Sequence, residues 1–133
     1  MKQARSLKIY LATRYRRIDE MKRRAEDLRK LGHLVTSRWL DGHHEAPGTL
    51  DDPSWPEIAQ EDVDDVRAAD VVVSFTQSQR GGGGGRHVEF GIAVGLGKRL
   101  VLVGPREHLF HTLPSVEVYR TWPEALESLA TQP

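Results

Sequence analysis

An almost wholly apolar segment lies near the middle of the chain: Asp70-Val71-Val72-Val73-Ser74-Phe75. A strand of this composition is typical of a parallel sheet that helices cover on both faces. It is followed by a loop over residues 76–86, which holds the glycines at 81–85. Apolar positions of helical spacing then run from 87 to 96 and end at Gly97. The segment is therefore predicted to be a covered strand that leads through a glycine-rich loop into a helix.

Strands and helices alternate on both sides of this unit. The apolar patterns predict further strands at 7–12, 34–40, 100–103 and 116–119, and helices at 15–31, 58–69 and 121–129. Such alternation predicts an α/β fold: a flavodoxin-like, doubly wound, five-stranded parallel sheet of order 2-1-3-4-5, with helices on both faces. Ligands of such sheets bind outside the carboxyl ends of the strands. The loops at 13–17, 76–86 and 104–108 are expected to meet there.

The composition narrows the possible functions. A length of 133 residues predicts one domain, residues 1–133. The absence of cysteine excludes disulfides, thiolate zinc sites and cysteine nucleophiles, and it suits a reducing, cytoplasmic location. No apolar run reaches the ~20 residues of a membrane span. The 19 basic and 19 acidic residues balance, which argues against a broad nucleic-acid surface. Neither His43-His44-Glu45 nor the pair His108 and His111 has a metal-ligand spacing, so we expect no metal and no cofactor.

The balanced charge conceals two opposite regions. Residues 1–30 carry 11 basic and 4 acidic side chains, whereas residues 41–70 carry 10 acidic side chains and one arginine. Two solvated faces would explain this pattern. A basic loop that receives an anion, beside an acidic element that transfers protons, would explain it equally well.

The helix after the glycine-rich loop carries a carboxylate on its inner face. Glu89 is in helical register with the apolar residues Ile92, Ala93 and Leu96. Either the helix dipole alone stabilises this carboxylate, or Glu89 is a nucleophile or base that faces the loop. Two glycines one turn apart, Gly91 and Gly95, predict close packing of the same helix on the sheet.

A second inward carboxylate is predicted on the preceding helix. Asp62 shares a stripe with Ala59, Val63 and Val66, whereas Asp64 and Asp65 are expected to face solvent. Asp62 is either a satisfied carboxylate at the helix flank or the partner of Glu89. Two such groups beside one strand suit glycosidic chemistry, in which one carboxylate is nucleophilic and the other manages protons.

At this point the sequence resembles the nucleoside 2-deoxyribosyltransferase family, over roughly residues 7–130. The resemblance is carried, in order, by Ile9-Tyr10-Leu11-Ala12, by Asp62 eight residues before Asp70, by Gly85-Arg86-His87-Val88-Glu89-Phe90-Gly91 and by Gly97-Lys98-Arg99. It implies cleavage of an N-glycosidic bond in a nucleoside or nucleotide. Glu89 matches the nucleophile that attacks the sugar C1′, Asp62 the acid that assists the departing base, and Tyr10 the tyrosine near the nucleophile. The resemblance also implies a homo-oligomer, a dimer or larger.

The sequence departs from the base-exchanging members in two places. Gly83 stands where they often carry an aspartate, and the terminus 130–133 does not resemble the tail that they lend to a neighbour's site. Both departures put base exchange in question, so the sugar acceptor is either another base or water. The related 5′-monophosphate N-glycosidases hold phosphate with an arginine after the first strand. The residues predicted to bind substrate are Thr13, Arg14, Arg16, Arg17, Gly83, Gly84, Gly85, Arg86 and His87.

Two alternatives stay open at this point. The chain could be a non-catalytic nucleotide-binding module of the same fold. It could also resemble the cytokinin-activating phosphoribohydrolases, whose Pro-Gly-Gly-x-Gly-Thr-x-x-Glu motif fits Gly82 to Gly85 and Glu89. Gly81 and Arg86 replace the proline and threonine of that motif, so this resemblance is the weaker one.

Overall fold

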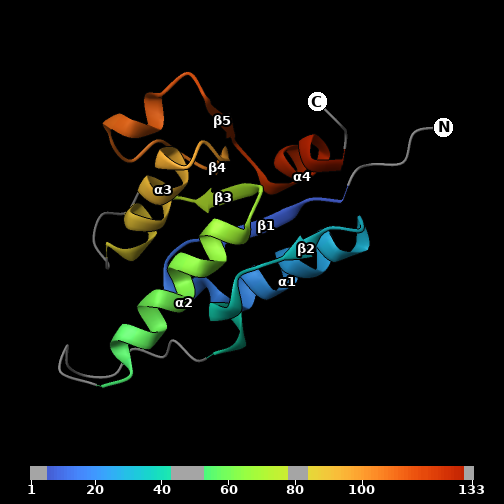
Figure 1. Ribbon diagram of the computed structural model, residues 1–133. Coiled ribbons are helices and arrows are strands. Elements are labelled where there is room, and N and C mark those ends of the chain that lie inside the picture. The colour runs from blue at the N-terminus through green and yellow to red at the C-terminus, as the bar shows by residue number, and fades with distance from the viewer. Residues whose placement is uncertain (1–5, 43–52, 78–83, 131–133) are drawn as a thin grey trace.

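The computed structural model describes residues 6–42, 53–77 and 84–130, which form one five-stranded parallel sheet with helices around it (Figure 1). The strand order is β2-β1-β3-β4-β5, as the sequence predicts. The strands are β1 (Lys8–Ala12), β2 (Leu34–Val35), β3 (Val71–Phe75), β4 (Arg99–Val103) and β5 (Val116–Tyr119). The α-helices are α1 (Ile18–Lys30), α2 (Trp55–Ala68), α3 (Gly85–Gly95) and α4 (Trp122–Ala130). Three 3₁₀ turns complete the described elements: η1 (Tyr15–Arg17), η2 (Arg38–Asp41) and η3 (Leu109–Thr112).

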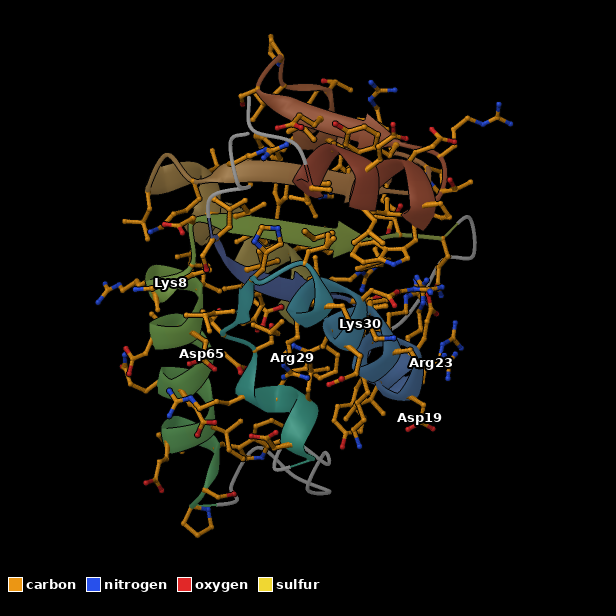
Figure 2. The ribbon with its side chains drawn as sticks, turned by 90° about the vertical axis from the view of Figure 1, so that its right-hand side faces the viewer. Lys8, Asp19, Arg23, Arg29, Lys30 and Asp65 are labelled. Atoms are coloured by element: carbon orange, nitrogen blue, oxygen red, sulfur yellow. The ribbon has the colours of Figure 1, made fainter. Side chains whose placement is uncertain are left out.

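The sheet is the middle layer of three. Helices α2 and α3 pack against each other on one face, and α1 and α4 lie on the other face (Figures 1 and 2). The indole of Trp122 joins α4 to α1 by donating a hydrogen bond to Asp27 (2.9 Å), and its ring packs on Phe75 of β3 (5.4 Å between centroids). All five residues of β3 are buried, which confirms that this strand is covered on both faces. The outward side of α1 carries charged residues, among them Asp19, Arg23, Arg29 and Lys30 (Figure 2).

The second strand is shorter than its apolar pattern predicts. Only Leu34 and Val35 pair with β1, and the prediction of a strand through residue 40 is wrong. Side chains replace the main-chain ladder beyond that point. The Ser37 hydroxyl accepts the Leu11 N–H (2.7 Å), and the Trp39 indole donates to the Leu11 carbonyl (2.8 Å). Because these side chains occupy the free edge of β1, the chain turns into η2 instead of continuing the strand.

Two expectations about helix faces are also wrong. Asp65 is buried, at 5% exposure, because its carboxylate accepts from the main-chain N–H of Arg38 (2.9 Å) and pairs with the Arg38 guanidinium (2.8 Å). It thereby fastens α2 to η2, as its position in Figure 2 illustrates. Gly91 and Gly95 lie on the exposed side of α3, where an added Cβ would meet no atom within 4 Å. The helix therefore does not need these glycines to approach the sheet.

No helix within the described ranges combines the length and the apolar character that a membrane crossing requires.

Candidate active site

The centre of the candidate site is a contact between β1 and the first turn of α3. Tyr10 points from β1 toward the α2–α3 face of the sheet and is fully buried. Its hydroxyl donates a short hydrogen bond to Oε2 of Glu89. Glu89 reaches the strand because it lies on the inner side of α3, one residue before the buried Phe90. The inward register predicted for Glu89 is thus present in the structure.

Burial makes this carboxylate reluctant to ionise. It raises the pKa of Glu89 from its ordinary value to about 8, with a further increase from the nearby charge of Asp62. The hydrogen bond from Tyr10 acts in the opposite direction, because it stabilises the ionised form. The pKa of Tyr10 is raised well above its usual range by burial and by the charges of Glu89 and Asp62. The tyrosine hydroxyl therefore acts as the donor and the carboxylate as the acceptor.

Asp62 lies close enough to act on both groups. It projects from α2, which packs against α3, and its charge raises the pKa values of both Tyr10 and Glu89. The structure therefore brings Tyr10, Asp62 and Glu89 together from β1, α2 and α3. One hydroxyl and two carboxylates brought together in this way can divide nucleophilic and proton-transfer roles.

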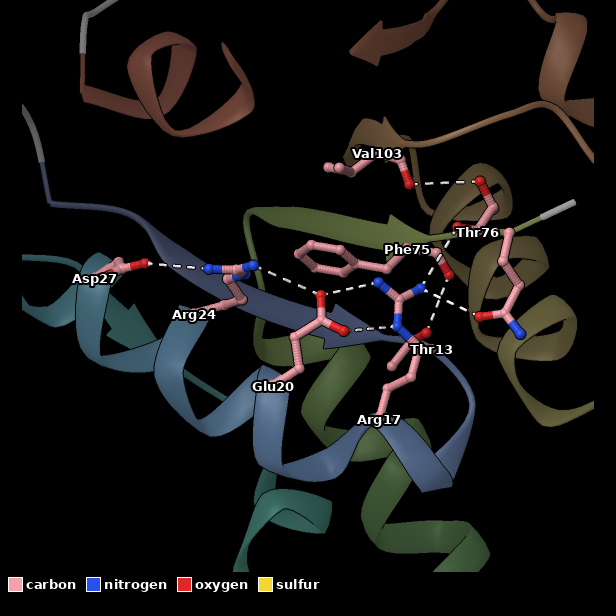
Figure 3. Close-up of polar contacts among 9 residues, drawn as sticks. Thr13, Arg17, Glu20, Arg24, Asp27, Phe75, Thr76 and Val103 are labelled. Atoms are coloured by element: carbon pink, nitrogen blue, oxygen red, sulfur yellow. Dashed lines mark hydrogen bonds and ion pairs between the residues drawn. The ribbon is translucent and has the colours of Figure 1, made fainter. Parts of the chain in front are cut away.

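The loop after β1 is tied to the end of β3. The Thr13 hydroxyl donates to the Phe75 carbonyl (3.0 Å), so this predicted ligand residue also bridges the two strands (Figure 3). The Arg17 guanidinium pairs with both carboxylate oxygens of Glu20 (2.9 Å each) and donates to the Thr76 carbonyl (3.4 Å). It also lies over the ring of Phe75, 5.6 Å from its centroid. Arg17 is therefore firmly held, and Glu20 compensates its charge.

The other two arginines of this loop lie beside the residue that follows Thr76. Arg14 is half-buried and Arg16 is exposed, and both guanidiniums are within hydrogen-bonding reach of the Gln77 side chain. The pKa of Arg14 is lowered by desolvation and then by the like charges of Arg86 and Arg16. Cations from the β1 loop and from the start of α3 are thus close enough to repel one another.

The start of α3 is tied to the loop after β4. The Arg86 guanidinium forms a largely buried ion pair with Glu107 (2.8 Å). Its neighbour His87 lies edge-on to His108, 4.8 Å between centroids, and burial followed by the charge of Arg86 lowers the pKa of His87. His111 stacks on His108 at 3.7 Å, and burial lowers its pKa to about 4.

A small pocket lies among these elements at the end of β3. It is lined by Ser74, Phe75, Thr76, Arg86, His87, Phe90 and His111. At its edge, Gly104 has a φ of +118°, and a side chain there would meet the Thr76 hydroxyl at 2.6 Å. The three loops that the strand order predicts to be neighbours are therefore in contact through Arg17, Thr76 and Glu107.

The structure gives less support to the predicted ligand role of the glycines than to that of the arginines. Gly84 caps α3 and Gly85 begins it, and both are exposed with open space where a Cβ would lie. Neither has a positive φ, so only the approach of a ligand would require glycine at these positions. The predicted ligand residue Gly83 lies outside the described residues.

Two residues of the site were missed at the level of sequence. Gln77 lies two residues after the end of β3 and Glu107 four residues after the end of β4, so both lie at the carboxyl edge of the sheet. Position at that edge was the available indication, but neither residue belongs to a motif. Among the described residues, no group of three or more histidine or acidic side chains is arranged to hold a metal ion.

The sequence and the fold are similar to those of known proteins. Residues 9–116 match the sequence model of the family described as nucleoside 2-deoxyribosyltransferase. The CMP N-glycosidase BcmB of Clostridium botulinum has a similar structure (TM-score 0.61, 22% identity, 92% of this chain and 97% of that one). So does a 2-deoxyribosyltransferase of Bacillus psychrosaccharolyticus (TM-score 0.69, 20% identity, 95% of this chain and 98% of that one). At these identities the two likenesses concern the fold. No curated protein sequence gives a significant match.

Proposed function

The chain belongs to the nucleoside 2-deoxyribosyltransferase family, an enzyme family, and on this basis we propose that it cleaves the N-glycosidic bond of a (2′-deoxy)nucleoside or a nucleoside 5′-monophosphate. The observation that carries the proposal is the hydrogen bond from buried Tyr10 to the inward carboxylate of Glu89. A carboxylate kept from water beside a second carboxylate suits a reaction with a positively charged, oxocarbenium-like transition state.

The proposed reaction has two steps at C1′ of the sugar. In the first, a carboxylate oxygen of Glu89 forms a bond to C1′ while the C1′–N bond breaks and its electron pair leaves with the base. Asp62 donates a proton to the departing base, so that the base leaves neutral. In the second, an acceptor attacks C1′ and displaces Glu89, and Asp62 recovers a proton from that acceptor. Both Glu89 and Asp62 end as they began.

Tyr10 is proposed to position the nucleophile. Its hydroxyl donates to one oxygen of Glu89, which leaves the other oxygen to face C1′. The same bond lowers the pKa of a carboxyl group that burial would otherwise keep protonated. Tyr10 therefore supports both the orientation and the charge that nucleophilic attack requires.

The arginines support a phosphorylated substrate. Arg14, Arg16 and Arg17 follow β1 and Arg86 opens α3, and desolvation together with the like charges of Arg86 and Arg16 lowers the pKa of Arg14. A neutral 5′-hydroxyl would leave this repulsion in place, whereas a phosphate would relieve it through charge-assisted hydrogen bonds. We therefore propose that the site takes a 5′-monophosphate, with Thr13, Gly84, Gly85 and His87 beside the substrate. Gly83 remains a sequence-based proposal.

The acceptor is proposed to be water in preference to a second base. Gly83 stands where base-exchanging relatives often carry an aspartate. The decisive experiment incubates the purified protein with nucleosides and with 5′-monophosphates, each with and without a second free base, and separates the products by chromatography. Released base with a free sugar phosphate is expected. A new nucleoside formed only with the second base would instead favour the transferase. Tight binding without any product would favour the non-catalytic nucleotide-binding module.

We also propose a homo-oligomer. Apolar side chains are exposed near both ends of α3. Val88, in its first turns, is 63% exposed, and Leu96, its C-terminal cap, is 49% exposed although helical register predicts it on the inner side. We take these exposed apolar side chains as the association surface. Because α3 also carries Glu89, a second copy on this face would lie near the site.

A further inference from the structure

Three guanidiniums converge on one neutral side chain, Gln77. When the amide oxygen faces the guanidiniums of the β1 loop, it accepts from Nη2 of Arg16 at 2.7 Å and from Nη1 of Arg14 at 3.2 Å. This orientation is preferred because the reverse one turns the amide NH₂ toward donors. In the reverse orientation the oxygen accepts from Nη1 of Arg17 at 3.4 Å. In both cases Gln77 supplies an oxygen to cations.

The arginines around Gln77 donate to different kinds of acceptor. Arg17 has Glu20 as a bidentate partner, and Arg86 has Glu107. Arg14 and Arg16 meet at Gln77 an oxygen that carries only a partial negative charge. Two charge-assisted hydrogen bonds are satisfied in this way, but the repulsion between the guanidiniums persists. An oxygen of a dianion at the same point would satisfy the same donors and also neutralise them.

We propose that Gln77 is a specificity-determining residue whose amide oxygen occupies, in the unliganded protein, the position of a substrate phosphate oxygen. This inference rests on the proposed 5′-monophosphate substrate and adds the residue that sets its affinity. Phosphate entry displaces the amide oxygen, and Arg14 and Arg16 exchange a neutral acceptor for an anionic one. Gln77 holds the two guanidiniums close together before binding. An incoming phosphate must therefore displace its amide oxygen, which lowers the affinity for phosphate.

The proposal predicts different effects on phosphate affinity for two substitutions of Gln77. Gln77→Glu places a permanent carboxylate among the guanidiniums, so it should weaken phosphate binding at least tenfold, the size expected for displacing a charged hydrogen-bond partner. It should also raise the melting temperature in phosphate-free buffer. Gln77→Met keeps the length of the side chain but has no oxygen. It removes the competitor, so phosphate affinity should stay equal or rise several-fold, while the phosphate-free melting temperature falls.

The probe is inorganic phosphate, titrated at constant ionic strength against sodium chloride, and the readouts are calorimetric affinity and the rise in melting temperature. Gln60→Glu is the matched control, since it makes the same change of charge on the outward side of α2. Unchanged phosphate affinity in Gln77→Glu would overturn the inference. A loss of affinity in Gln77→Met would also overturn it, because Gln77 would then be a direct ligand instead of a competitor.

These binding measurements need no turnover, which separates this inference from the proposed function. If no substrate releases base but phosphate responds to the two variants as described, the proposed activity fails and the role of Gln77 stands. If base is released from monophosphates but both variants bind phosphate like the unmodified protein, the proposed function stands and the role of Gln77 fails.

Discussion

Two opposing effects set the pKa of the Glu89 carboxyl group, and this pKa determines when Glu89 is ionised. Burial and Asp62 favour the protonated form, whereas the Tyr10 hydrogen bond favours the ionised form. The balance leaves the pKa at about 8, close to neutral pH. A group with such a pKa can be switched by small changes in its surroundings. Three predictions at the scale of single residues follow from this balance.

Glu89→Gln should abolish turnover and leave the fold at least as stable. The amide retains the shape of the carboxyl and still accepts from Tyr10, but it is a poor nucleophile. Because the pKa of Glu89 lies above its ordinary 4.5, the folded protein holds a proton that the unfolded chain releases between pH 4.5 and about 8. Stability of the unmodified protein therefore falls as pH rises through this window.

Thermal melts at several pH values check this, with exposed Glu57→Gln as the control. The advantage of Glu89→Gln over the unmodified protein should grow from pH 5 to pH 8. Near-normal product release by this variant would remove Glu89 from the proposed mechanism.

Tyr10→Phe should move the pH profile of the reaction. Attack requires ionised Glu89, so kcat/KM should rise with pH on its acid side and level off above about 8. Loss of the Tyr10 hydroxyl removes an interaction that lowers the pKa of Glu89, so the acid limb should shift to higher pH. Tyr119→Phe is the control, since its hydroxyl also contacts a carboxylate, Glu117 on β5 (3.0 Å). If the acid limb of the kcat/KM profile did not shift in Tyr10→Phe, Tyr10 would not have its proposed role of lowering the pKa of Glu89.

Asp62→Asn should lower kcat more than it raises KM. Proton transfer to a leaving base contributes about 10²–10⁴-fold, and the amide cannot provide it. Substrates whose base leaves without protonation should be affected less. Steady-state kinetics measure kcat and KM for this variant, with Asp64→Asn as the control. A change confined to KM would make Asp62 a binding residue.

At the scale of elements, the structure follows the apolar periodicities closely and departs from them where side chains bond to the main chain. The covered strand β3 was predictable because its composition is almost wholly apolar, and the helix α3 because apolar residues recur in it at helical spacing. The shortening of β2 was not, since it depends on Ser37 and Trp39 bonding to Leu11, twenty-six and twenty-eight residues earlier in the chain. Nothing in a local pattern encodes contacts across that separation.

Asp65 illustrates the same limit and can be tested. Its position off the apolar stripe of α2 predicts exposure, but Arg38 from η2 covers it. Asp65→Ala should lower the free energy of unfolding by about 1–3 kcal/mol, because it leaves the partly buried N–H of Arg38 without its acceptor and breaks the ion pair with the Arg38 guanidinium. Denaturant unfolding measures the change. The adjacent, exposed Asp64→Ala is the control and should change it little; equal effects would show that Asp65 does not fasten α2 to η2.

At the scale of the whole molecule, the strand order and the meeting of three loops were predictable, because parallel strands deliver their carboxyl ends to one edge. The inward carboxylates of the site also followed from helical register. Which arginines are engaged did not follow from sequence. Arg17 is held by Glu20 and Phe75, and Arg86 is held by Glu107, through side-chain contacts that composition and spacing leave open.

The proposed oligomer is tested at the exposed apolar side chains of α3. Leu96→Glu introduces a charge at the C-terminal cap of this helix and should shift the protein toward monomers, because a buried charge without a partner opposes association. Light scattering after size-exclusion chromatography gives the mass. Leu34→Glu, at a comparably exposed leucine on β2 (58%), should leave the mass unchanged. A monomeric unmodified protein would contradict the oligomer directly.

The location of Tyr10 within β1 and of the arginines beyond its end has a consequence for how such a protein can diverge. The groups proposed to break the bond are held by a strand and two helices, whose geometry the core fixes. Several groups proposed to choose the substrate, among them Arg14, Arg16 and Gln77, lie on connecting segments, which accept substitutions with little effect on the core. Selection for a new substrate can therefore change the segment at 13–17 and the residues after β3 while the groups proposed to break the bond stay in place.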